Sequence, residues 1–189
     1  MSDLLEVEQK YRVDSFDAVR RRLTDAEALE QVVERDTYFA HPVRDFAQTD
    51  EAFRLRSIES ASGERHVLTY KGPRRKAAVK TRLEREVPLG GDRQTAEAML
   101  VDLGFDPVAE VTKRREAFAT VAEGLRVLVT LDDVERAGRF VEVEVVAEDA
   151  AAAEAAVLAV AERLCLTSVE RLSYLAIVLT GGTDEASPG

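Results

Sequence analysis

The fold is decided by a segment near the N-terminus that reads Leu5-Glu6-Val7-Glu8-Gln9-Lys10-Tyr11-Arg12-Val13. Successive side chains of a β-strand point to opposite faces of the sheet. The charged side chains of this segment therefore share one face, and its valines and Tyr11 share the other. The segment predicts a strand with one charged face and one apolar face.

Similar alternation runs through much of the chain and predicts further strands. With the first segment, the expected strands cover residues 5–13, 31–39, 53–60, 65–71, 78–87, 108–121, 125–132 and 139–146. Apolar residues at helical spacing predict helices after a cap at Ser15, from a cap at Asp92 to Gly104, and over residues 150–164 and 169–179. We therefore expect an α+β fold with a mainly antiparallel sheet, and eight strands can close into a β-barrel.

Seven of the eight expected strands carry charged residues on one face. A half-exposed strand that shows its charges to water is the ordinary explanation for any one of them. The apolar stripes of the helices, however, need the apolar faces of the strands to cover. If the helices lie outside, the charged faces line the inside of the closed sheet. Small soluble barrels fill their interior with apolar side chains, so a charged lumen needs a polar occupant.

The charges themselves indicate what that occupant is. The inward candidates are nine basic and seven acidic residues, in a chain whose net charge is −10. The basic residues are Lys10, Arg12, Arg54, Arg56, Lys71, Lys80, Arg82, Lys113 and Arg115, and the acidic ones are Glu6, Glu8, Glu84, Glu86, Asp132, Glu142 and Glu144. Four of the chain's five lysines are in this set, and lysines gathered on one face suit phosphate. Carboxylates packed beside them suit a hard divalent cation, Mg²⁺ or Mn²⁺.

The length and composition of the chain limit its domain organisation, its partners and its location. The 189 residues suit a single domain over residues 1–182, followed by a polar, disordered tail over residues 183–189. The acidic net charge argues against nucleic acid or an anionic membrane as a partner. The acidic N-terminus and the single cysteine, Cys165, favour a cytoplasmic location, and we expect that cysteine to be core filler.

Other catalytic templates are missing from the sequence. It contains no Walker A loop, no G-x-G-x-x-G and no nucleophile elbow. His41 and His66 with one cysteine cannot make the usual zinc sites; we expect the first in a loop and the second outside the barrel. The basic run at residues 74–76 has two readings, a solvated turn or a lid over a phosphate entrance.

The ordered set of motifs resembles a known family, the CYTH domain or triphosphate tunnel metalloenzymes. The matching segments are Glu6-Val7-Glu8-Gln9-Lys10, Phe53-Arg54-Leu55-Arg56, Thr69-Tyr70-Lys71-Gly72-Pro73, Lys80-Thr81-Arg82-Leu83-Glu84-Arg85-Glu86, Lys113-Arg114-Arg115, Leu131-Asp132 and Gly138-Arg139-Phe140-Val141-Glu142-Val143-Glu144. They run in order through about residues 4–178. The segment from Asp36 to Phe46 is most similar to the branch of class IV adenylyl cyclases.

The resemblance implies an eight-stranded antiparallel tunnel and roles for individual residues. It implies that the metal ligands are Glu6, Glu8, Asp132, Glu142 and Glu144. It implies that the triphosphate is held by Lys10, Arg54, Arg56, Lys71, Lys113 and Arg115. Lys80, Arg82, Glu84 and Glu86 match the family pattern, the first two as further substrate-binding residues. Glu6, Glu8 and Lys10 are the expected catalytic core.

Several functions fit these residues. The first is a cyclase that converts ATP into cyclic AMP and pyrophosphate with Mg²⁺ or Mn²⁺. The second is a triphosphatase that hydrolyses thiamine triphosphate, inorganic triphosphate or a nucleoside triphosphate. A third is a non-catalytic binder of polyphosphate or a nucleotide, although pure anion binding does not need seven acids among the bases. The expected partner is a triphosphate-containing small molecule, and a homodimer is compatible with every reading.

Overall fold

The computed structural model describes residues 5–75 and 79–181, and the predicted tail at residues 183–189 lies outside them. The strands are β1 (Leu5–Val13), β2 (Glu27–Ala28), β3 (Val32–Ala40), β4 (Ala52–Ser60), β5 (Gly63–Lys71), β6 (Lys80–Leu89), β7 (Asp106–Ala122), β8 (Leu125–Val134), β9 (Gly138–Ala147) and β10 (Val169–Glu170). The helices are α1 (Asp17–Arg20), α2 (Phe46–Thr49), α3 (Arg93–Asp102), α4 (Ala150–Arg163) and α5 (Tyr174–Leu179).

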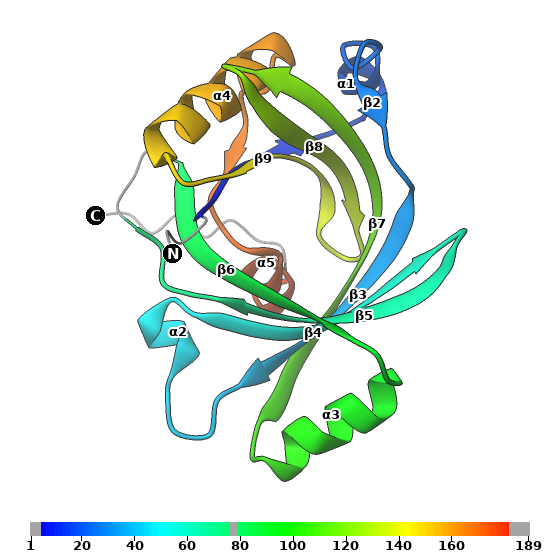
Figure 1. The fold of residues 1–189 in the computed structure, drawn as a ribbon, viewed down its shortest axis with the longest axis vertical. Helices are drawn as coiled ribbons and strands as arrows, with labels where there is room; N and C mark the ends of the chain where they lie inside the picture. Colours follow the sequence, from blue (N-terminus) through cyan, green and yellow to red (C-terminus); the bar gives the residue numbers. More distant parts are fainter. Residues whose placement is uncertain (1–4, 76–78, 182–189) are drawn as a thin grey trace.

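Eight of the strands close into an antiparallel barrel (Figure 1). Their order around the ring is β1-β6-β5-β4-β3-β7-β8-β9, and β9 pairs again with β1. The two short strands sit on this ring, β10 beside β1 and β2 beside β7. The structure therefore confirms the predicted eight-stranded barrel.

The register of the strands places the charged faces together. Glu8 of β1 lies opposite Glu144 of β9, and Lys10 lies opposite Glu142. Directly opposed residues of an antiparallel pair point to the same side of the sheet. The charged faces of neighbouring strands thus form one continuous inner wall.

The apolar faces of β1, β8 and β9 point outward and are covered by α4. The largest cluster of buried apolar residues joins the valines of β1, β8 and β9 to Ala153, Ala156, Val157 and Val160 of α4, all four fully buried. The helix begins at Asp149, whose carboxylate accepts hydrogen bonds from the backbone N–H of Ala151 and Ala152. Its alanine-rich face lets the helix lie close against the sheet. The main core is therefore outside the barrel, between the sheet and this helix.

A second apolar cluster lies under α3, where Leu100 packs with Phe39 and Leu55. The helix starts as predicted, because Asp92 accepts a hydrogen bond of 2.8 Å from the backbone N–H of Thr95. It ends at Asp102, and Gly104 follows with a φ of +89°, a conformation that favours glycine after a helix. Among the described residues, no helix is long and apolar enough to cross a membrane.

Two predictions about the C-terminal third were wrong. Residues 169–179 do not form one helix: residues 169–170 are the strand β10, and only residues 174–179 form a helix, α5. The segment starts extended because Glu170 pairs with Lys10 in the β1–β10 ladder, while its carboxylate accepts from Arg12 at 3.1 Å. Cys165 is exposed rather than buried, because it takes the left-handed conformation (φ 57°) directly after α4 ends.

The helix α5 lies within the ring of strands in Figure 1. Its Tyr174 and Ile177 pack with Tyr38, Val111 and other inward residues of the strand ends. These strand residues have the same phase as the charged residues of the inner wall, so α5 is seated inside the barrel. It closes part of the lumen with a small apolar plug.

Candidate functional site

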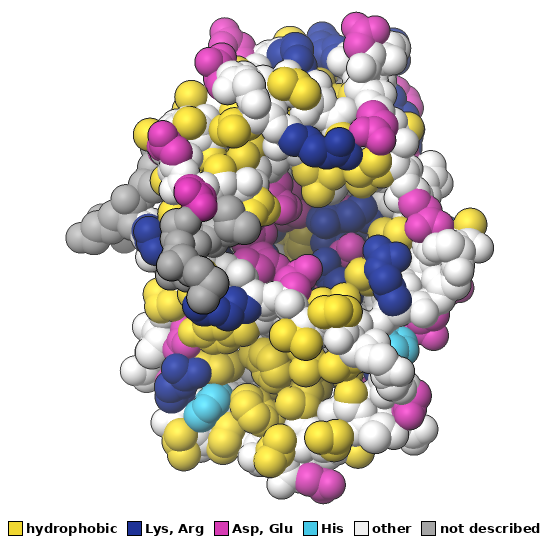
Figure 2. All heavy atoms as spheres, viewed as in Figure 1, with side chains coloured by type: hydrophobic (Ala, Val, Ile, Leu, Met, Phe, Trp, Pro, Cys, Tyr) yellow, Lys and Arg dark blue, Asp and Glu magenta, His cyan; other side chains and the backbone are white. Residues whose placement is uncertain are grey.

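The lumen is a chamber with a volume of about 710 Å³, and Figure 2 shows a hollow with basic and acidic side chains on its walls. Of the fifteen predicted site residues, fourteen line it: Glu6, Glu8, Lys10, Arg54, Arg56, Lys71, Lys80, Arg82, Glu84, Glu86, Lys113, Arg115, Glu142 and Glu144. The remaining one, Asp132, is fully buried directly behind Arg115. The sequence prediction placed these side chains around one cavity, and the structure brings them there.

One side of the chamber is organised around Lys71 at the end of β5. Its ammonium lies 2.9 Å from Glu6 and 2.6 Å from Glu84. Burial alone would lower the pKa of Lys71, but the two carboxylates outweigh it and raise that pKa. Burial raises the pKa of Glu6, against the opposing effect of the lysine. Lys71 is therefore a permanently charged cation with its tip fixed in place.

Lys10 is held differently, against an aromatic ring. Its ammonium lies 3.6 Å from the centre of the Tyr174 ring, donates to the carbonyl of Leu172 at 3.1 Å, and lies 3.5 Å from Glu142. Burial lowers the pKa of Lys10 to about 8, although Glu142 acts in the opposite direction. The plug helix thus fixes the position of a predicted catalytic residue.

Asp132 anchors the far wall of the chamber. It accepts hydrogen bonds from Arg115 at 2.7 Å and from the hydroxyl of Tyr174 at 2.9 Å, and Lys113 lies 3.5 Å from it. Arg115 also contacts Glu142 at 2.8 Å. These contacts hold the two basic side chains of β7 at the surface of the cavity.

Sequence reasoning missed two acidic residues of β3, Glu34 and Asp36. Arg56 donates to Asp36 at 2.6 Å and lies 2.9 Å from Glu34, and Lys113 lies 3.1 Å from Glu34. Burial would raise the pKa of Asp36, but the neighbouring arginines, including Arg54, lower it to about 2. Both carboxylates stay ionised and hold the arginines of β4 in place. The sequence did contain a signal for them. Glu34, Asp36 and Tyr38 are spaced two residues apart in the predicted strand, so their side chains share one face.

Comparison with known proteins now gives the family. The family model of the CYTH domain matches residues 4–172, nearly the whole chain. This chain belongs to the CYTH family. A protein of Methanocaldococcus jannaschii with the name "Putative adenylate cyclase" is 33% identical over 143 residues, which are 75% of this chain and 77% of that protein.

Solved structures agree with this family. The protein PH1819 from Pyrococcus horikoshii superposes with a TM-score of 0.81 at 35% identity, over 93% of this chain and 98% of the other. An X-ray structure described as a putative adenylate cyclase from Vibrio parahaemolyticus gives 0.77 at 26% identity, over 94% of this chain and 99% of the other. The tunnel geometry is therefore that of a CYTH protein.

The CYTH chamber also holds carboxylates suited to a divalent cation. Glu144 faces the cavity beside Glu6 and Glu8, and burial together with the charge of Glu6 raises the pKa of Glu144 to about 8. A carboxyl group that burial and like charge keep protonated is one that a hard cation with oxygen ligands would stabilise as a carboxylate. Within residues 5–75 and 79–181, no three acidic, histidine or cysteine side chains are already arranged as a metal cluster. The carboxylates are the type of donor that Mg²⁺ or Mn²⁺ binds, although Glu6 and Glu8 are each paired with a lysine in this arrangement.

The connection between β3 and β4 forms one rim of the CYTH chamber. Phe46 and Ala47 of α2 line the cavity, while His41 turns its ring back to accept from the backbone N–H of Val43 at 3.1 Å. Arg74 also lines the cavity, with its guanidinium 2.7 Å from Asp50. This ion pair holds Arg74 at the rim. Lys76 of the same basic run lies outside the described residues.

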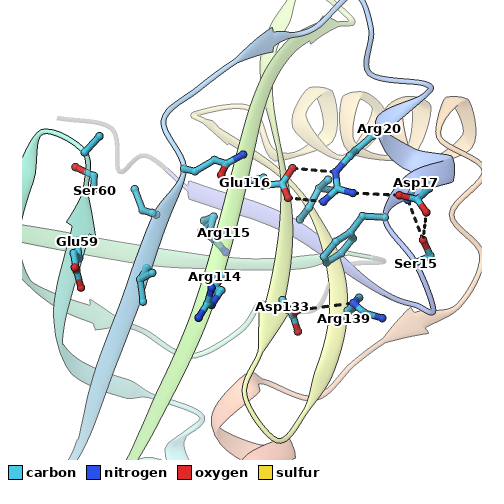
Figure 3. Close-up of a pocket in the computed structure, with 16 residues that line it drawn as sticks. Ser15, Asp17, Arg20, Glu59, Ser60, Arg114, Arg115, Glu116, Asp133 and Arg139 are labelled. Atoms are coloured by element: carbon cyan, nitrogen blue, oxygen red, sulfur yellow. Dashed lines mark hydrogen bonds and ion pairs between the residues drawn. The ribbon is translucent and has the colours of Figure 1, made fainter.

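A second cavity, of about 670 Å³, is lined by α1 and the residues before it, by the start of β3 and the end of β4, and by β7, β8 and β9; Arg115 lines both cavities. Figure 3 shows Arg20 pointing to Glu116 and Asp17, and Arg139 lies 3.9 Å from Asp133. Two of its four labelled arginines, Arg20 and Arg139, thus point at neighbouring acids. The inner chamber of the CYTH barrel is the stronger candidate for the functional site.

Proposed function

We propose that this CYTH chain is a metal-dependent enzyme that transfers phosphoryl groups of a triphosphate, with the reaction of an adenylyl cyclase. The observation that carries the proposal is the chamber itself, where buried ammonium and guanidinium groups are held in fixed positions by carboxylates. Fixed charges in a site away from bulk water stabilise developing charge more strongly than mobile ones in solution. A phosphate chain is the ligand that such a wall of cations recognises best.

The proposed roles follow the positions of the side chains. Lys71, Arg54 and Arg56 grip the phosphate chain from one side, and Lys10, Lys113 and Arg115 from the other. Lys80 and Arg82 lie toward β1, where Lys80 is 3.5 Å from Glu8. Glu6, Glu8, Glu142 and Glu144, with Asp132 behind Arg115, would hold Mg²⁺ or Mn²⁺. Such an ion supplies charge neutralisation at phosphate oxygens and lowers the pKa of an oxygen it binds.

In the proposed reaction, the ribose 3′-oxygen forms a bond to the α-phosphorus of ATP. The bond from that phosphorus to the bridging oxygen of the β-phosphate breaks, and pyrophosphate leaves with the electron pair. The hydroxyl proton passes to a carboxylate of the chamber or to water. The residues of the chamber contribute mainly by holding the reacting oxygen in line with the α-phosphate, within roughly 3–3.5 Å. The name of the Methanocaldococcus jannaschii relative supports this choice of reaction.

The products decide between the two catalytic readings. The purified protein is incubated with ATP and Mn²⁺ or Mg²⁺, and the products are separated by chromatography and identified by ³¹P NMR. Cyclic AMP and pyrophosphate are expected. ADP with phosphate, or faster cleavage of inorganic triphosphate than of any nucleotide, would replace the cyclase by a triphosphatase. The observation that favours a triphosphatase is the charged wall, because its cations would contact only the phosphate chain of a substrate. Binding without any product would leave a non-catalytic binder.

Ligand binding is expected to stabilise the protein in a particular way. In the ligand-free barrel many like charges lie close together, and bound Mg²⁺ with tripolyphosphate would relieve their repulsion. A ligand at a hundred times its Kd stabilises the folded state by about 2.7 kcal/mol. For a domain of this size, that corresponds to a rise of roughly 5–10 °C in Tm. Thermal unfolding should show a larger rise with both ligands than the sum of the rises with each alone; no shift at millimolar concentrations would contradict the proposal.

A further inference from the structure

The chamber is not uniformly charged, and its apolar part lies at one mouth. The apolar lining residues from the helices and the nearby strand end are Phe46, Ala47, Ala52, Leu175, Ala176 and Leu179. They come from α2, the start of β4 and α5. The cations that we assign to the phosphate chain lie on the walls of the same cavity. One cavity therefore combines a charged interior with an apolar rim.

The topology explains why these apolar residues meet. The strand β3 runs into α2, and β4 starts directly after it, so α2 lies at the mouth where β3 ends and β4 begins. The helix α5 lies at that same mouth, because its Leu175 and Val178 belong to the same apolar cluster as Tyr38 near the end of β3 and Ala52 at the start of β4. The rim thus has one wall from α2 and another from α5.

The side chains of this rim are accessible. Phe46 and Leu175 are half-buried, and Leu179 is 61% exposed. The helix α5 is anchored on its other side by Ile177, which is 1% exposed. The rim is therefore an apolar surface open to the cavity, and Ile177 anchors its α5 wall.

We infer that the slot between α2 and α5 binds the organic end of the substrate, an aromatic group such as a nucleobase joined to the triphosphate. The inference rests on the proposed function, because the phosphate chain in the charged interior directs the other end of the substrate to this mouth. The total volume of about 710 Å³ lies within the range of pockets that enclose drug-sized ligands. An inorganic triphosphate would leave the apolar rim empty, so the slot selects organic triphosphates.

The test uses two ligands and two variants of exposed or half-exposed rim residues. Phe46→Ala and Leu179→Ala each remove apolar surface of the slot and no charge. Leu158→Ala on the outside of α4, where the side chain is 43% exposed, is the matched control. Binding of ATP and of inorganic tripolyphosphate, each with Mg²⁺, is measured by isothermal titration calorimetry on the full chain. We expect about a tenfold loss of ATP affinity in each rim variant, with tripolyphosphate affinity changed less than about twofold.

The outcomes separate this inference from the proposed function. Unchanged ATP affinity in both rim variants, or equal losses for the two ligands, overturns the slot while wild-type binding of tripolyphosphate still supports the phosphate site. A wild-type protein that binds neither ligand overturns the proposed function and the slot with it. Retained tripolyphosphate affinity in a variant also shows that the variant is folded.

Discussion

Lys10→Ala is expected to lower kcat/KM for the triphosphate substrate by about 10²–10³-fold, the size found when a single preorganised donor is removed from an active site. Lys10 is almost completely buried, and its ammonium contacts Glu142, the Leu172 carbonyl and the rings of Tyr174 and Phe140. Burial lowers the pKa of Lys10, so the fold disfavours its charged form, and Arg115 still pairs with Glu142 when the ammonium is removed. The variant is therefore expected to fold and to lose mainly substrate affinity.

Glu8→Gln complements this experiment, because it removes a carboxylate instead of a cation. We expect a similar loss of turnover, with the loss appearing in the dependence on Mg²⁺ or Mn²⁺ concentration. Arg126→Ala serves as the control, since Arg126 does not line the chamber and makes an exposed ion pair with Glu27. Steady-state kinetics and circular dichroism are measured on all three variants. Rates near wild type for Lys10→Ala and Glu8→Gln, with any triphosphate, would contradict the tunnel assignment.

The local alternation of side chains was enough to predict the barrel and most of its lumen. In β1 and β9 the inward acidic and basic residues alternate mainly with valine or tyrosine, so the two faces differ clearly and the inward set can be chosen. Eight strands can close into a barrel, and helices that need an apolar surface to cover indicate that the apolar faces of the strands point outward. This part of the prediction depends only on period-2 geometry, which a sequence contains directly.

Two features could not be found in the same way. Glu34 and Asp36 were missed because the opposite face of β3 carries Arg35 and Thr37, so neither face of that strand stands out as apolar. The role of α5 depends on contacts between residues distant in sequence, such as Tyr174 with Asp132. No local pattern records that Tyr174 lies against Lys10. The charges and their period-2 spacing in the sequence locate the walls of the chamber. The positions of α5 and of the apolar rim depend on tertiary packing, which the local sequence does not show.

Glu144→Gln is expected to have opposite effects on stability and activity. Burial and the charge of Glu6 raise the pKa of Glu144 from 4.5 to about 8 in the folded protein. Because the folded-state pKa lies above that of the unfolded chain, wild-type stability is lost as the pH rises from about 4.5 to about 8. The glutamine variant cannot titrate there. The difference in unfolding free energy between variant and wild type should therefore grow in favour of the variant from pH 5 to pH 8 and level off above it.

The same substitution should reduce turnover strongly, because it removes one of the oxygen ligands proposed for the metal. Loss of even an outer-shell partner of a bound metal costs about 10–100-fold in affinity or activity, so loss of a ligand should cost at least about 100-fold. Chemical unfolding of the metal-free protein with EDTA at several pH values measures the first effect, and kinetics with Mn²⁺ measures the second. Glu162→Gln, on the exposed face of α4, is the control for both. Parallel stability curves for Glu144→Gln and wild type would show that the carboxyl group is not held protonated by its surroundings. Wild-type turnover in Glu144→Gln would show that Glu144 is not a ligand of the proposed metal. The ionised carboxyl group of Glu144 would then lower the stability of the protein at neutral pH without contributing to catalysis.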